Sequence, residues 1–142
     1  MLAPDLGKQY QVKKICDENN IDFFAYSPLS FGILCIDPDK EQNKEKSFIR
    51  NTLFEKYKQP TYELRRCLKR IANQRSVSQA QVAINWCCYQ GAIPLVGMRK
   101  RSQVIDVSNV FKWNLNKSEF KVLQELSKKC LKKMPKNPFS SI

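Results

Sequence analysis

Two short apolar segments, each directly preceded by a helix-like segment, limit the fold of this chain most tightly. Residues 21–26 and 93–96 are mostly apolar and predict buried strands. The segments before them, residues 10–20 and 78–90, carry apolar side chains at helical spacing. Strands separated by helices pair in parallel, so the sequence predicts an α/β protein with two parallel strands. Parallel sheets are normally covered on both faces, which indicates that this pair is part of a larger fold.

Several helix ends are marked by local signals. Ser78 and Gln81 have the spacing of a capping box, and Gly91 stands where a helix commonly ends. Asn116 and Glu119 repeat the capping-box spacing before the last apolar periodic segment. These signals predict a helix between the two strands and another helix after the second strand.

The chain is strongly basic, with 25 Lys and Arg against 13 acidic residues and a formal charge of +12. This charge favours polyanionic partners such as nucleic acid or phosphorylated cofactors. A helix after Pro60 carries four cations opposite its apolar face: Arg65, Arg66, Lys69 and Arg70. They are compatible with a nucleic-acid stripe, but we favour a solvated helix face and do not expect nucleic acid as a partner.

The cysteines and the lack of histidine bear on metal binding and on the redox compartment of the chain. The six cysteines form no C-x-x-C pair and the chain has no histidine, so the sequence offers no zinc site. Adjacent Cys87 and Cys88 in an apolar segment indicate reduced thiols in an intracellular reducing compartment. We expect the cytoplasm, although the pattern does not distinguish it from an organelle. No apolar stretch approaches about 20 residues, so no membrane span is predicted.

Two segments are predicted to lie outside the regular elements. Residues 36–59 are predicted to form an exposed loop, because residues 35–46 are polar, rich in both charge signs and interrupted by Pro38. Within this segment, residues 51–58 could form a short helical turn. Residues 134–142 contain Pro135 and Pro138 and predict a loose C-terminal tail.

The segment after the second strand has the features of an anion site. Gly97 ends the strand, and the cations Arg99, Lys100 and Arg101 follow it directly. Ser102 could then cap a helix whose first N–H groups and partial positive charge attract anions. Arginine can hold a phosphate with two parallel hydrogen bonds. The alternative is a solvated basic loop before a surface helix.

Three blocks of the chain, in order, resemble the C-terminal portion of the aldo-keto reductases. Residues 25–32 are similar to the motif A-Y-S-P-L-x-x-G, residues 78–91 to the helix before the eighth strand, and residues 93–106 to the I-P-x-x-G-x-[RKS] loop. That family consists of (β/α)8 TIM barrels that use a nicotinamide cofactor, usually NADPH. The resemblance implies that residues 1–142 are a partial barrel with strands 7 and 8. As a separate chain it could self-associate through open strand edges.

The resemblance implies cofactor contacts after both strands. Tyr26 would stack on the nicotinamide, and the pyrophosphate would be contacted by Ser27, Leu29 and the backbone near Phe31. The residues after the second strand would contact the 2′-phosphate and the adenine end: Gly97, Met98, Arg99, Lys100, Gln103 and Asp106.

The chain departs from the family pattern in two respects. Val107 stands where many members have asparagine, which removes one implied adenine contact. The family's catalytic Tyr, Lys, Asp and His belong to its N-terminal portion, so we assign no catalytic residue and expect the chain alone to be inactive. The sequence therefore predicts the NADP(H)-binding part of an oxidoreductase that transfers hydride between NADPH and a carbonyl substrate. The alternative is a non-catalytic basic module that binds RNA or another polyanion.

Overall fold

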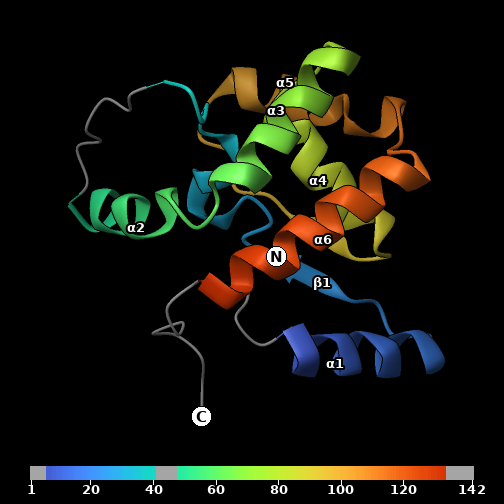
Figure 1. Ribbon diagram of the computed structural model, residues 1–142. Coiled ribbons are helices and arrows are strands. Elements are labelled where there is room, and N and C mark those ends of the chain that lie inside the picture. Colours follow the sequence, from blue (N-terminus) through green and yellow to red (C-terminus); the bar gives the residue numbers. More distant parts are fainter. Residues whose placement is uncertain (1–5, 41–47, 134–142) are drawn as a thin grey trace.

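The computed structural model describes residues 6–40 and 48–133. Two short strands stand among helices along the described chain (Figure 1). In chain order the elements are α1 (Leu6–Glu18), β1 (Phe24–Tyr26), the 3₁₀ helix η1 (Ser30–Cys35), α2 (Phe48–Lys58), α3 (Tyr62–Arg75), α4 (Gln79–Tyr89), β2 (Ile93–Leu95), α5 (Arg101–Ser108), the 3₁₀ helix η2 (Val110–Lys112) and α6 (Lys117–Lys133).

The two strands lie side by side and run in parallel. Phe24 pairs with Ile93 and Tyr26 with Leu95, although the two strands are far apart in the sequence. A helix precedes each strand, as expected. The predicted α/β class with two parallel strands is confirmed, and the arrangement is consistent with part of a (β/α)8 barrel.

The strand pair is covered on one face. Ala25 is buried with Ala92 and with Cys87 of α4. On the opposite face Leu95 is 52% exposed and Tyr26 is 73% exposed. The prediction that residues 21–26 and 93–96 form buried strands is therefore wrong for the described part of the chain, because helix α4 covers only the side on which Ala25 lies.

The main core lies between α3, α4 and α6, which are gathered together in Figure 1 while α1 and α2 lie at the periphery. Leu64 and Leu68 of α3, Val82 of α4 and Leu123 of α6 are fully buried there. Leu34 of η1 joins the same core. Because this leucine is held in the core, η1 is fixed against the helices that follow it.

The predicted exposed loop at residues 36–59 needs correction, because the structure has helix α2 over Phe48–Lys58. Phe54 and Tyr57 lie three residues apart on this helix, and both are buried against Ile33 of η1. The helix is longer than the short turn expected at residues 51–58, because this long-range contact stabilises it. Residues 41–47 of the loop and the predicted tail at residues 134–142 lie outside the described residues.

The predicted solvated face of α3 is wrong at Arg65, whose side chain is buried. Its Nε donates to the Thr61 hydroxyl at 3.2 Å, and its Nη2 donates to the Lys58 carbonyl at 2.8 Å. Lys69 is also engaged, since its Nζ lies 2.7 Å from Asp37 and 2.9 Å from Asp39. Two of the four cations of the stripe therefore have structural roles.

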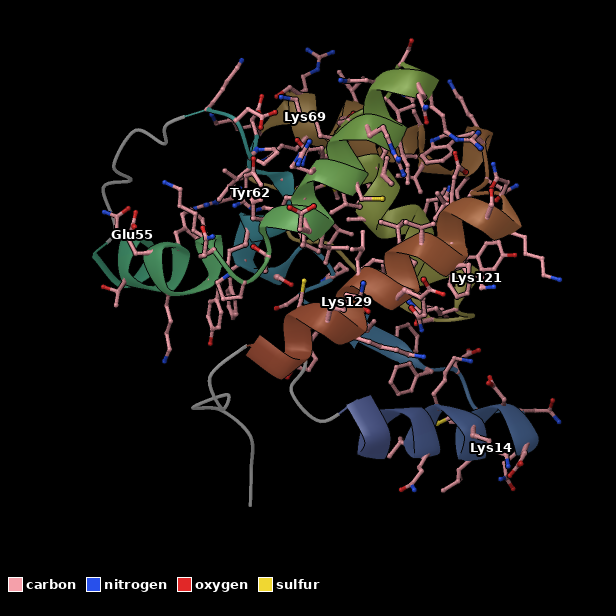
Figure 2. The ribbon with its side chains drawn as sticks, in the orientation of Figure 1. Lys14, Glu55, Tyr62, Lys69, Lys121 and Lys129 are labelled. Atoms are coloured by element: carbon pink, nitrogen blue, oxygen red, sulfur yellow. The ribbon has the colours of Figure 1, made fainter. Side chains whose placement is uncertain are left out.

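The labelled lysines in Figure 2 come from separate elements, with Lys14 on α1, Lys69 on α3, and Lys121 and Lys129 on α6. The positive charge of the chain is thus distributed over several elements of the described structure. Among the described residues, no helix has the length and apolar character needed to cross a membrane.

Candidate functional site

A cavity of about 310 Å³ lies beside the C-terminal ends of the two strands. Parallel pairing brings the segments after β1 and β2 to the same edge of the sheet, where ligands of α/β proteins commonly bind. Five of the residues that the sequence predicts as cofactor contacts line this cavity: Leu29, Gly97, Met98, Gln103 and Asp106. The structure therefore brings together residues that are about 70 positions apart in the sequence.

The other predicted contacts lie outside the lining of this cavity. Tyr26 lies at the end of β1 and is 73% exposed on the uncovered face of the strand pair. Phe31 is exposed and Ser27 is half-buried. Arg99 and Lys100 are exposed beside the cavity, directly after Met98.

The segment after β1 has an unusual backbone. Ser27, Ser30 and Phe31 adopt left-handed conformations with φ of 50°, 49° and 57°, and Gly32 has φ of 92°. The Ser30 N–H donates to the Ser27 carbonyl at 2.9 Å. Non-glycine residues in this region are strained and often occur at functional sites, where the surrounding structure holds them.

The strained segment is held by contacts on its C-terminal side. The Gln79 amide of α4 donates to the carbonyls of Leu34 and Ile36 at 3.3 and 3.4 Å. A few residues later, the Lys69 ammonium donates to Asp37 and holds the pKa of that carboxyl below its ordinary value. Helices α3 and α4 therefore fix the end of η1.

The segment after β2 begins its helix earlier than predicted. Helix α5 starts at Arg101 with Lys100 as its N-cap, so Ser102 lies inside the helix. The Gln103 side chain accepts the N–H of the N-cap residue. Gln103 Oε1 accepts the N–H groups of Arg99 at 2.8 Å and of Lys100 at 3.0 Å. The predicted role of Ser102 is therefore wrong, although a helix does begin beside the cations.

Gly97 leaves the cavity open at this point. A Cβ added to it would meet no atom within 4 Å, so the protein's own packing does not require a glycine here. The open space would let a ligand approach the backbone closely.

Asp106 is held by residues of α4. The Ser78 hydroxyl donates to its Oδ2 at 2.6 Å, and the Gln81 amide donates to its Oδ1 at 2.7 Å. Ser78 also accepts the N–H of Gln81 at 3.0 Å, so its predicted N-cap is confirmed. The prediction that the Gln81 side chain completes a capping box at Ser78 is wrong. This side chain instead donates to Asp106 and accepts the indole N–H of Trp113.

Sequence reasoning missed the contribution of α4 to the cavity. Ser78, Gln79 and Ala80, which begin this helix, line it beside Gly97 and Asp106. The capping pattern at Ser78 marked the helix start, but it carried no signal that this start faces the ends of the strands.

The residues around the cavity have chemistry that suits a phosphate group. The cavity is bordered by exposed cations, open backbone at Gly97, and the start of α5. Phosphates bind such combinations of cations and helix N-termini. In the described ranges, 6–40 and 48–133, no cluster of three or more His, Cys, Asp or Glu could hold a metal ion.

Comparison with known proteins gives two matches. The model of the aldo/keto reductase family matches residues 5–128. A protein of Arabidopsis thaliana named "Pyridoxal reductase, chloroplastic" is 33% identical over 137 residues, which cover 96% of this chain and 37% of that protein. The chain therefore spans little more than a third of the length of this relative.

Proposed function

Because this chain belongs to the aldo/keto reductase family, we propose that it forms the NADP(H)-binding part of a carbonyl-reducing oxidoreductase. The cavity at the ends of β1 and β2 carries this proposal, because five predicted cofactor residues line it and exposed cations border it. A cofactor phosphate would bind where Gly97 leaves the backbone open and where Arg99 and Lys100 supply positive charge.

The two strand ends would hold different parts of the cofactor. Tyr26, exposed at the end of β1, would lie against the nicotinamide ring, and the strained backbone from Ser27 to Phe31 would follow the pyrophosphate. Leu29 would contact the cofactor from the cavity wall. Bound NADPH supplies a hydride to a carbonyl carbon, whereas the residues of this chain bind and orient the cofactor.

The substrate would be a carbonyl compound held by a complete barrel. The name of the Arabidopsis relative suggests pyridoxal, an aldehyde, as the first compound to assay. No residue of this chain is assigned as the proton donor, so cofactor binding is a better test of the chain than turnover. The compartment would be a reducing one, either the cytoplasm or an organelle.

The proposal is tested by titrating the chain with NADPH and with NADH. Replacing Arg99 with alanine should weaken NADPH binding by about 1.5–3 kcal/mol more than NADH binding, because only NADPH has the 2′-phosphate. Arg66→Ala, which removes an exposed arginine of α3, is the matched control and should change neither affinity.

Two results would contradict the proposal. Equal weakening of both cofactors by Arg99→Ala would show that this residue does not contact the 2′-phosphate. Tighter binding of a single-stranded RNA oligonucleotide than of NADPH would favour the basic-module alternative.

A further inference from the structure

Asp106 lines the candidate cofactor cavity, yet both oxygens of its carboxylate are engaged by α4. The partners are the Ser78 hydroxyl at 2.6 Å and the Gln81 amide at 2.7 Å. The Gln81 amide is itself oriented, because its Oε1 accepts the Trp113 indole N–H at 3.1 Å. The Gln81 amide nitrogen must then face the carboxylate, and this makes the contact specific.

The Asp106 carboxylate accepts both of these hydrogen bonds. Hydrogen bonds to a charged carboxylate are about twice as strong as those between neutral groups. Ser78 is the N-cap of α4, so the carboxylate also lies at the positive end of that helix. These interactions tie α5 to α4 at a point beside the cavity.

The same helix carries Gln103, which lies one turn before Asp106. Gln103 Oε1 accepts the backbone N–H groups of Arg99 and Lys100 at 2.8 and 3.0 Å. A continuous set of contacts thus leads from the buried Gln81 through Asp106 and along α5 to the backbone of the cationic segment. A shift of α5 against α4 would move this backbone.

We propose that Asp106 is a positioning residue: bound by Ser78 and Gln81, it fixes α5 on α4 so that Gln103 holds Arg99 and Lys100 in place for a phosphate. This inference rests on the proposed cofactor function and changes one expectation. The family resemblance implies that Asp106 contacts the adenine end, whereas its carboxylate is used to join two helices.

The test compares NADPH with its 1,N6-etheno analogue, in which the adenine amino group is blocked. Asp106→Ala and Ser78→Ala should each weaken binding by about 5- to 20-fold, and by the same factor for both ligands, because neither side chain touches adenine. The double variant should be no weaker than Asp106→Ala, since Asp106→Ala alone already removes the contact to Ser78. Ser78→Thr keeps the hydroxyl and should restore affinity.

Two variants serve as controls. Ser108→Ala removes a hydroxyl of α5 that donates only to the Ile105 carbonyl of its own helix. Asp22→Ala removes an exposed carboxylate away from the cavity. Both should bind the two ligands as the unmodified chain does. A loss on Asp106→Ala that is larger for NADPH than for the etheno analogue, or additive losses in the double variant, would overturn the proposal.

Hydrogen exchange gives a readout that needs no cofactor. Asp106→Ala should speed the exchange of the Arg99 and Lys100 amides, which Gln103 protects, while Ser108→Ala should leave it unchanged. Unchanged exchange in Asp106→Ala would refute the positioning role even if NADPH binds. If the unmodified chain fails to bind NADPH but the exchange changes as expected, the proposed function fails and the α4–α5 connection stands.

Discussion

The backbone conformation at Gly91 restricts which residue type this position tolerates. It ends α4 with φ of 72°, and a Cβ placed on it would lie 3.0 Å from Lys13 Nζ. Gly91→Ala should therefore lower the free energy of unfolding by about 1–2 kcal/mol, as measured by chemical denaturation. Gly97→Ala is the matched control, because a Cβ there meets open space and φ is not left-handed. Equal losses in the two variants would contradict this account.

Arg65 is a second residue whose effect can be predicted. Burial lowers the pKa of its guanidinium, and the side chain joins the end of α2 to α3 through Lys58 and Thr61. Arg65→Ala would leave the Lys58 carbonyl without this donor and open a cavity, so it should cost about 2–4 kcal/mol in thermal or chemical unfolding.

The neighbouring arginine provides the control for Arg65. Arg66→Ala removes an exposed side chain whose nearest carboxylate, Glu63, is 3.9 Å away. It should change the stability by less than about 0.5 kcal/mol. A small effect of Arg65→Ala, similar to that of Arg66→Ala, would mean that Arg65 does not hold α2 in place.

At the scale of elements, one ion pair connects α3 to α6. Arg75 donates to both carboxylate oxygens of Glu119 at 2.9 and 2.7 Å, and its guanidinium lies 5.0 Å from the Trp113 ring centre. Burial alone would raise the pKa of Glu119, but Arg75 and the Asn116 N–H together hold it below the ordinary 4.5. Glu119 also completes the predicted capping box with Asn116, which is confirmed.

This pair predicts a pH dependence of stability. Because the pKa of Glu119 is lower in the folded state, its contribution is present above the unfolded value of 4.5 and is lost as the pH falls through the folded pKa. Glu119→Gln should therefore cost about 1–2 kcal/mol at pH 7 and progressively less below about pH 4.5.

The measurement is thermal unfolding from pH 7 to pH 3 for the unmodified chain and two variants. Glu125→Gln, on an exposed position of the same helix, should change the stability little at any pH. Asp37, whose pKa is also lowered, titrates in all three proteins, so the comparison isolates Glu119. A constant difference between Glu119→Gln and the unmodified chain across this range would exclude the ion pair as its cause.

At the scale of the whole molecule, the uncovered face of the strand pair predicts association. Leu95 is 52% exposed and Tyr26 is 73% exposed on that face, and the two-stranded sheet has two open edges among the residues that the structure describes. We expect the chain alone to show helical circular dichroism, a broad thermal transition, and species larger than a monomer in size-exclusion chromatography.

A pair of variants tests whether the association uses this face or any exposed apolar side chain. Leu95→Lys should reduce the association, whereas Phe111→Lys, at a residue of η2 that is 79% exposed, should not. A monodisperse monomer with a sharp cooperative transition would contradict the prediction, because it would show that the chain is stable with this face exposed to solvent.

The sequence by itself determined the features that depend on neighbouring residues. The helix before each strand, the N-caps at Ser78 and Asn116, and the left-handed end of α4 at Gly91 follow from periodicity and local hydrogen bonding, which act over a few residues. The parallel order followed because each strand is preceded by a helix.

Only the tertiary structure decided which of these residues meet. Phe54 and Tyr57 make α2 part of the fold because Ile33 buries them, and the polar sequence around them gave no sign of this contact. Asp106 finds its partners 28 and 25 residues earlier in the chain, at Ser78 and Gln81. Such contacts depend on how whole helices pack, so neither the periodicity nor the charge of a local segment can specify them.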